Sequence, residues 1–203
     1  MEIKVLSLGF IGVNCYLVLS EGEAIVIDPG FYDKRIADFL SDNSDKERLI
    51  LITHGHYDHI GGALKLSRET ATKIAIGALE NDALSDADLN LSGLFGDELE
   101  PFSADILLEE GKFMLGDLEF EIIFTPGHTK GGVCYKFGDV VFSGDTLFCR
   151  SIGRTDFPTG DYKTLMNSIE KLLLLPDDTK LLSGHGEMTT LGSERVNNPF
   201  LNR

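Results

Sequence analysis

The sequence predicts an α/β protein whose core is two β-sheets packed face to face, with helices on the outside. Three observations support this class. Short apolar runs bounded by turn residues recur along the 203-residue chain. Helical periodicity follows the strands in each half, and no linker or low-complexity segment divides the chain. A chain of this length can bury a sizeable core, so we expect one domain spanning residues 1–203.

In the first half of the chain, alternating or continuous apolar runs predict strands. These are expected at residues 2–8, 14–20, 24–28, 49–53 and 73–76. Apolar residues at helical spacing predict helices at residues 33–41, 58–68 and 77–84. The stretch 85–103 has weak periodicity, so we expect a long loop with a turn or two of helix over the mouth of a site. Its apolar side chains Leu91, Leu94 and Phe95 are candidates to line a substrate channel.

The second half repeats the pattern of strands followed by a helix. Strands are expected at residues 106–108, 112–115, 118–124, 133–137, 140–143 and 180–183. Gly-Asp pairs at 116–117 and 138–139 predict tight turns between neighbouring strands. The clearest helix is expected at residues 162–175, because Pro176 follows the last helical position.

Charge and cysteine content exclude several classes of function. The net charge of −15 argues against nucleic acid or an anionic membrane as the main partner. The N-terminus lacks the features of a signal peptide and no apolar stretch reaches the length of a membrane span, so we expect a cytoplasmic protein. Cys15, Cys134 and Cys149 lie in apolar settings, which favours small buried side chains over nucleophiles. The sequence carries no signal for an oligomeric state.

A dense group of metal-type side chains follows the apolar run 49–52. It reads Thr53-His54-Gly55-His56-Tyr57-Asp58-His59. A lone histidine is usually a surface or core residue. Three imidazoles and a carboxylate this close together instead indicate that they bind a metal together. The two remaining histidines, His128 and His185, also follow an apolar run and a turn, as does Asp145. The predicted strands therefore deliver ligand-type side chains at their C-terminal ends.

These side chains match the ligands that two neighbouring metal ions need. Histidines two positions apart, such as His54 and His56, can reach one metal, while Asp58 and His59 face a second. Asp145 has two oxygens and is the natural bridge. We expect two divalent metal ions, zinc first, with iron or manganese as alternatives. A hydroxide held between them is a nucleophile at neutral pH, which suits hydrolysis of an ester, thioester or lactone.

The ordered ligand set resembles that of the metallo-β-lactamase superfamily over nearly the whole chain. It consists of His54, His56, Asp58, His59, His128, Asp145 and His185. The resemblance implies an αββα four-layer sandwich with the metal site at one edge of the two sheets. His54, His56 and His128 would hold the first metal, and Asp58, His59 and His185 the second, with Asp58 and Asp145 as catalytic carboxylates. A histidine directly after Asp58 is expected to set the chain apart from true β-lactamases.

Within that superfamily the chain is similar to the glyoxalase II group, especially its short bacterial members. The segments that carry this similarity are Thr125-Pro126-Gly127-His128-Thr129, Gly144-Asp145-Thr146-Leu147-Phe148 and Ser183-Gly184-His185-Gly186. The similarity implies hydrolysis of a small-molecule thioester, S-lactoylglutathione. The family's basic residue for glutathione matches Arg154, and Arg150 is a second candidate for substrate binding. Asp156 stands where longer members place a tyrosine, so a thioesterase or lactonase with another substrate stays open.

One rival belongs to a different class of reaction. The segment Gly153-Arg154-Thr155-Asp156-Phe157 is also similar to the persulfide dioxygenases. Those enzymes hold one iron with two histidines and an aspartate, here His56, His128 and Asp145. Metal count separates the alternatives, because two metals favour hydrolysis and one iron favours oxygen chemistry.

Overall fold

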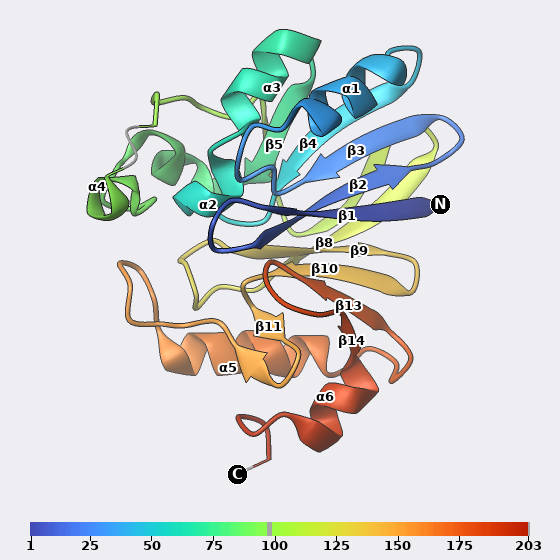
Figure 1. Ribbon diagram of the computed structural model, residues 1–203. Helices are drawn as coiled ribbons and strands as arrows, with labels where there is room; N and C mark the ends of the chain where they lie inside the picture. The colour runs from blue at the N-terminus through green and yellow to red at the C-terminus, as the bar shows by residue number, and fades with distance from the viewer. Residues whose placement is uncertain (97–98, 203) are drawn as a thin grey trace.

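The computed structural model describes residues 1–96 and 99–202, and its main strands form two six-stranded sheets packed face to face (Figure 1). Sheet 1 contains, in spatial order, β1 (Glu2–Leu8), β2 (Val13–Leu19), β3 (Glu23–Ile27), β4 (Glu47–Ile52), β5 (Lys73–Gly77) and β6 (Ile106–Leu108). Sheet 2 contains β14 (Thr189–Thr190), β13 (Lys180–Ser183), β10 (Val140–Gly144), β9 (Val133–Phe137), β8 (Leu118–Phe124) and β7 (Gly111–Leu115). A small hairpin, β11 (Leu147–Phe148) and β12 (Ser151–Ile152), stands beside them.

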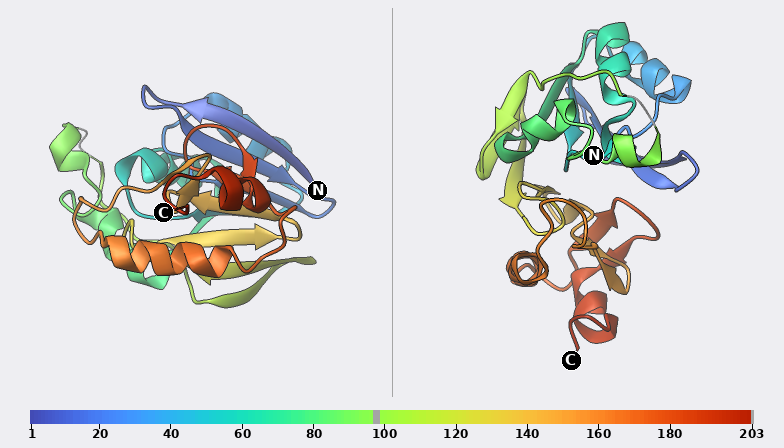
Figure 2. Two further views of the ribbon diagram at one scale, coloured as in Figure 1. Left: turned by 90° about the horizontal axis from the view of Figure 1, so that it is seen from below. Right: turned by 90° about the vertical axis from the view of Figure 1, so that its left-hand side faces the viewer.

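Helices cover the outer face of each sheet. On sheet 1 these are α1 (Lys34–Asp42) and α3 (Ala63–Thr70), and on sheet 2 they are α5 (Tyr162–Leu172) and α6 (Leu191–Asn197). The two helices of sheet 2 lie across its face in the view from below (Figure 2). The predicted αββα four-layer sandwich is thereby confirmed, including the expectation that the metal-type ligands come from strand ends.

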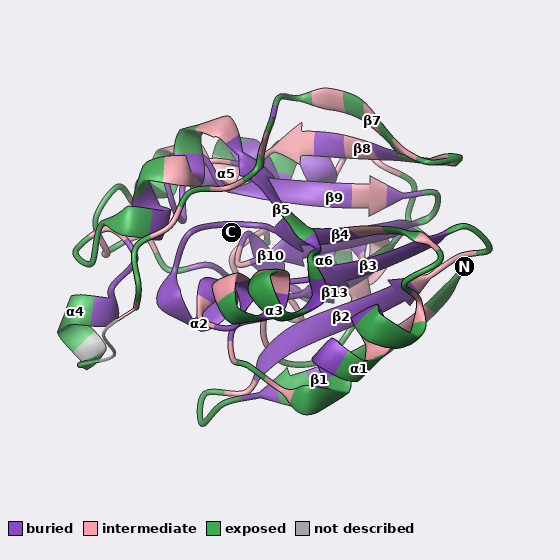
Figure 3. Cartoon of the chain, turned by 90° about the horizontal axis from the view of Figure 1, so that it is seen from above, coloured by how far each residue is buried: buried purple, intermediate pink, exposed green. Residues whose placement is uncertain are grey.

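The two-residue period of the strands explains why three apolar layers form. Along β4, Leu49 and Leu51 face sheet 2, whereas Ile50 and Ile52 face α1 and α3. In β10 the same alternation sends Phe142 toward sheet 1 and its neighbour Val141 toward α5. Strands buried on both faces therefore carry continuous apolar runs, and Figure 3 shows them buried while the outward faces of α1 and α3 are exposed.

Pairing directions bring several strand ends to one edge of the sandwich. Strands β3 to β6 are parallel to one another, and β10 is parallel to β13. Parallel neighbours end at the same edge of a sheet, and ligands in open α/β sheets bind beyond such carboxyl ends. The segments that follow β4, β10 and β13 therefore meet there.

Several predicted elements differ in detail from the structure. The helix expected at 58–68 is divided into α2 (Tyr57–Ile60) and α3, because Gly61 and Gly62 press against the backbone of residues 29–31. A Cβ atom at Gly62 would lie 2.5 Å from the Phe31 carbonyl carbon. The helix at 77–84 is a 3₁₀ helix, η1 (Ala78–Ser85), and α5 ends three residues earlier than expected. The β11–β12 hairpin and α6 were not predicted.

The long segment after η1 contains the expected short helix, α4 (Ser92–Phe95). Part of it, residues 97–98, and the side chain of Phe95 lie outside the described structure. Cys15 and Cys134 are buried, as predicted for small apolar side chains, and Cys149 is half-buried. Among the described residues, no helix is both long and apolar enough to cross a membrane.

Candidate metal centre

The structure brings all seven predicted ligand residues together at one end of the sandwich. They come from four strand ends: His54, His56, Asp58 and His59 after β4, His128 after β8, Asp145 after β10, and His185 after β13. Asp58 and His59 lie in α2, close to its beginning, as the sequence predicted. Two sheets thus contribute to one site, and each ligand loop is short.

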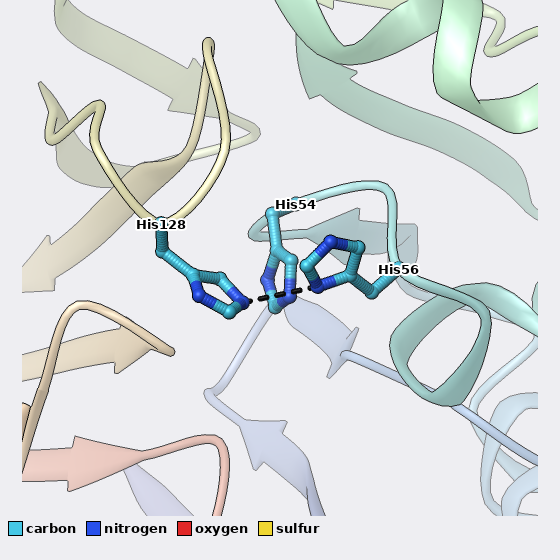
Figure 4. Close-up of side chains that lie close together, drawn as sticks. All are labelled: His54, His56 and His128. Atoms are coloured by element: carbon cyan, nitrogen blue, oxygen red, sulfur yellow. Dashed lines mark hydrogen bonds between the residues drawn. The ribbon is translucent and has the colours of Figure 1, made fainter. Parts of the chain in front are cut away.

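Three imidazoles form what we call the three-histidine group: His54, His56 and His128. Their ligand nitrogens all lie within 4.8 Å of one another, and Figure 4 shows the rings pointing toward a common centre. His56 Nδ1 and His128 Nε2 are 3.0 Å apart. All three residues are buried. Neutral imidazoles at this spacing are suited to holding a single transition-metal ion.

A second set, the mixed group, consists of Asp58, His59 and His185, whose ligand atoms also lie within 4.8 Å of one another. Asp58 Oδ2 is 3.2 Å from His185 Nε2 and 3.5 Å from His59 Nε2. This group therefore offers one carboxylate and two imidazoles to a second metal ion.

Asp145 lies between the two groups. Its Oδ1 is 3.4 Å from His59 Nε2, and its Oδ2 is 3.6 Å from His128 Nε2. Gly184 leaves room beside it, because a Cβ atom there would lie 2.2 Å from Asp145 Oδ1 and 2.6 Å from His59 Cε1. Ligand atoms of Asp145, His59 and His54 lie within 4.8 Å of one another, so the two groups meet here and the carboxylate faces both.

The pattern of unsatisfied polar atoms fits bound metal ions. Within the described part of the chain, buried His54 Nε2, His59 Nε2 and Asp145 Oδ1 have no hydrogen-bond partner. His56 Nε2 belongs to the same cluster, and because a buried polar atom without a partner is costly, such a cluster fits a site that a ligand completes. Imidazole nitrogens and a carboxylate oxygen are suitable donors to zinc, iron or manganese.

Hydrogen bonds on the opposite ring nitrogens orient these imidazoles. His59 Nδ1 donates to Asp28 Oδ2 at 3.0 Å, and His128 Nδ1 donates to the Arg154 carbonyl oxygen at 2.7 Å. The Thr53 hydroxyl donates to Asp28 and accepts from His54 Nδ1. Each bond fixes the orientation of its ring and turns Nε2 toward the centre of the site, which is the arrangement that metal-binding histidines use.

Electrostatics differ between the two groups. Burial lowers the pKa of His54 well below its ordinary value and lowers the pKa of His56 to about 3. Burial also opposes protonation of His59 and His185, but the neighbouring carboxylates outweigh it and raise the pKa of both. Burial raises the pKa of Asp145, yet the surrounding imidazoles, first His59, hold it well below its usual range. The carboxylates thus stay ionised and available to cations.

A cleft of about 380 Å³ opens onto these ligands. Its apolar walls are Ile11, Leu91, Phe148, Ile152 and Phe157. A larger cavity of about 580 Å³ lies between α3 and residues 99–102, but none of the seven predicted ligand residues lines it. Leu91 fulfils the expectation that the 85–103 segment contributes to the cleft, whereas Leu94 is 69% exposed and does not line it.

Of the two predicted substrate-binding arginines, only Arg154 lines the cleft. Its guanidinium lies 3.8 Å from the centroid of the Phe157 ring and forms a two-bonded ion pair with Asp156, at 2.7 and 2.6 Å. The pair lowers the pKa of Asp156 to about 2. Arg150 follows β11, and its backbone N–H donates to Glu194.

Sequence reasoning missed several residues that position the ligands. Asp28 links β3 to Thr53 and His59, and it could have been found, because it follows an apolar strand as the ligands do. Tyr16 and Asn14 hold the end of β13, where Tyr16 donates to the Ser183 carbonyl oxygen at 2.6 Å. Glu80, on η1, had no local signal at all.

Comparisons with known proteins agree with this geometry. The family model described as the Metallo-beta-lactamase superfamily matches residues 8–185. Probable metallo-hydrolase YqgX of Bacillus subtilis is 39% identical, with 100% of this chain and 98% of that protein covered. Hydroxyacylglutathione hydrolase GloC of Haemophilus influenzae is 38% identical, with 100% and 99% covered.

Solved structures show the same similarity. BLEG-1, named a B3 metallo-beta-lactamase, is 38% identical with a TM-score of 0.92 over 100% of both chains. TTHA1623, solved in a di-iron-bound form, is 36% identical with a TM-score of 0.87 over 98% of this chain and 100% of that one. ETHE1 of Myxococcus xanthus is 28% identical with a TM-score of 0.78, covering 98% and 84%. That His59, directly after Asp58, distinguishes the chain from true β-lactamases stays a prediction from the sequence. On the family match and the identities together, the chain belongs to the metallo-β-lactamase superfamily.

Proposed function

We propose that the protein is a binuclear metal hydrolase that cleaves a thioester, with S-lactoylglutathione as the first substrate to test. The observation that carries the proposal is Asp145, which faces both ligand groups at the base of an apolar-walled cleft. Two bound divalent ions, zinc first and iron or manganese as alternatives, would supply a hydroxide nucleophile at neutral pH and polarise the substrate carbonyl.

The chain's own residues supply binding, orientation and charge. Asp58 and Asp145, the two predicted catalytic carboxylates, have lowered pKa values because imidazoles surround them, so both remain ionised. The apolar walls exclude water from the acyl group. Arg154 lines the cleft and offers a positive charge to an anionic thiol portion of the substrate, such as glutathione. A free thiol has a pKa of about 8.5, so its thiolate is a stable leaving group and the reaction needs no protein acid to complete it.

Similarity to GloC supports a glutathione thioester, because that relative is named hydroxyacylglutathione hydrolase and aligns over the full length of this chain. A cytoplasmic location, a small-molecule partner and the absence of nucleic-acid and membrane partners stay predictions from the sequence. Arg150 also stays a prediction as a substrate-binding residue.

A second candidate is an iron-dependent persulfide dioxygenase. The observation that favours it is the close approach of His128 Nε2 to His56 Nδ1 at 3.0 Å and to Asp145 Oδ2 at 3.6 Å, because these are the three ligands that such an enzyme would use. Two metals per chain with thioester cleavage would support the hydrolase, whereas one iron with oxygen uptake would support the dioxygenase.

The deciding experiment measures thiol release from S-lactoylglutathione by full-length protein loaded with zinc, iron or manganese. We expect kcat/KM of about 10⁴ M⁻¹s⁻¹ or more with at least one metal. Oxygen uptake with glutathione persulfide is measured on the same samples. Lactones and a β-lactam complete the panel, because BLEG-1 is named a β-lactamase. Oxygen uptake without thioester cleavage would contradict the proposal, as would turnover of lactone or β-lactam alone.

A further inference from the structure

Glu80 joins the two loops that carry the three-histidine group. Its side chain is 2% exposed and lies on η1, which follows β5. Its Oε2 accepts from the Gly55 N–H at 2.8 Å, and its Oε1 accepts from the Gly131 N–H at 2.7 Å. Gly55 stands between His54 and His56, and Gly131 lies three residues after His128. One carboxylate therefore holds a loop of sheet 1 against a loop of sheet 2.

The fit between η1 and both loops is close. A Cβ atom at Gly55 would lie 2.4 Å from the Ala83 Cβ, and one at Gly131 would lie 2.5 Å from the Leu79 Cβ. Lys130 adds an ion pair with Asp82 at 2.5 Å, but both of those side chains are at the surface. Beneath the ligands, the Thr53 carbonyl accepts from the Val133 N–H at 2.9 Å and joins the strand ends themselves. Beyond those strand ends, Glu80 is a buried side chain, outside the ligand set, that ties the two loops together.

We propose that Glu80 is a positioning residue for the metal centre, which sets the affinity of the three-histidine group by fixing its two loops relative to each other. This inference rests on the proposed metal site. The physical reason is that ligands from two separately mobile loops bind a metal only after both loops are ordered. A preformed spacing removes that entropic cost before the ion arrives. Bonds from backbone N–H groups to a buried carboxylate are stronger than neutral ones, so the constraint is stiff.

The chain offers a matched control in Glu23. Glu23 is 5% exposed and lies on β3 of sheet 1, and its Oε1 accepts at 2.9 Å from the N–H of Asp117, in the turn between β7 and β8 of sheet 2. Glu23 pairs with Glu47, the first residue of β4, whereas the ligands follow the last residue of that strand. Both glutamates thus link the two sheets through backbone N–H groups, Glu80 through two and Glu23 through one, but at opposite ends of the sandwich.

The test measures zinc affinity and zinc content of full-length protein by competition with a chromophoric chelator. For Glu80→Ala we expect the dissociation constant of one zinc per chain to rise about 10- to 100-fold, the range typical of lost outer-shell partners. Glu80→Gln keeps one acceptor for one N–H and should weaken binding by about tenfold. Glu23→Ala should lower the melting temperature and leave both dissociation constants within about twofold of wild type.

The possible outcomes distinguish failure of the proposed function from failure of the proposed role of Glu80. If wild-type protein binds no zinc, iron or manganese, the proposed function fails. If wild type binds two ions and both Glu80 variants bind them equally tightly, only the role of Glu80 is overturned. Equal weakening by Glu23→Ala would also overturn it, because the effect would then follow general stability. A double variant shows which metal is affected. His185→Ala removes a ligand of the mixed group and leaves the three-histidine group intact. Adding Glu80→Ala to His185→Ala should therefore still raise the dissociation constant of the remaining zinc.

Discussion

The two ligand groups differ in how the metal-free chain accommodates them. The three-histidine group is buried, and burial keeps the pKa of His54 and His56 low, so neutral rings face one another. In the mixed group, imidazoles with raised pKa values lie beside Asp58 and Asp145, and the His185 side chain is 27% exposed. The mixed group can therefore balance its own charge, whereas the three-histidine group has no carboxylate of its own and we expect a cation to complete it.

This difference leads to an expectation about metal preference. Imidazole ligands suit zinc, while a carboxylate also accepts harder ions such as manganese. We expect the three-histidine group to bind more tightly and the mixed group to exchange its ion more readily. TTHA1623, which was solved with two irons, shows that a related protein holds iron.

The largest expected effect comes from Asp145→Ala, which removes the carboxylate that both groups share and so tests whether they form one centre. We expect metal content to fall from two ions to one or fewer, and kcat/KM for S-lactoylglutathione to fall by at least about 10²–10³-fold, as when a group that stabilises the transition state is lost. Metal analysis and steady-state kinetics measure both. Normal turnover in this variant would show that the groups act independently.

An intermediate effect should separate the two groups directly. His54→Ala removes a predicted ligand and should weaken one metal by more than the about 10- to 100-fold that loss of an outer-shell partner costs, whereas His185→Ala should leave that metal in place and lose the other. Zinc titrations of the two metal-free variants give the measurement. Loss of the same ion in both variants would contradict the division into two groups.

The smallest effects concern the rim of the cleft, where charge acts on the substrate rather than on the metals. Arg154→Ala should raise KM for S-lactoylglutathione by about tenfold, the effect of losing one partner of a charged contact. Asp156→Asn frees Arg154 from an exposed ion pair and should lower KM by only about two- to fivefold, because surface pairs are weak. An uncharged thioester serves as the control and should show neither change. If KM for S-lactoylglutathione stays unchanged in Arg154→Ala, its binding role is refuted.

Much of the site could be read from local pattern. The predicted ligands follow apolar runs that form strands in the structure. Parallel strands such as β3, β4 and β5 end at the same edge of their sheet. Ligand-type residues placed directly after such runs therefore already indicated one shared site. Element boundaries were less predictable. The break between α2 and α3 depends on Gly61 and Gly62 meeting the backbone near Gly30, which is a contact between distant parts of the chain.

The amino-acid sequence by itself determined the class of fold and the seven candidate ligands with their order, because strand periodicity and residue chemistry are local properties. Only the tertiary structure decided which residues support those ligands. Asp28 reaches His59 across 31 positions, and Glu80 reaches Gly131 across 51. It also decided that Arg154 lines the cleft while paired with Asp156. Such contacts depend on how loops approach one another after the sheets have packed, and no local periodicity encodes that approach.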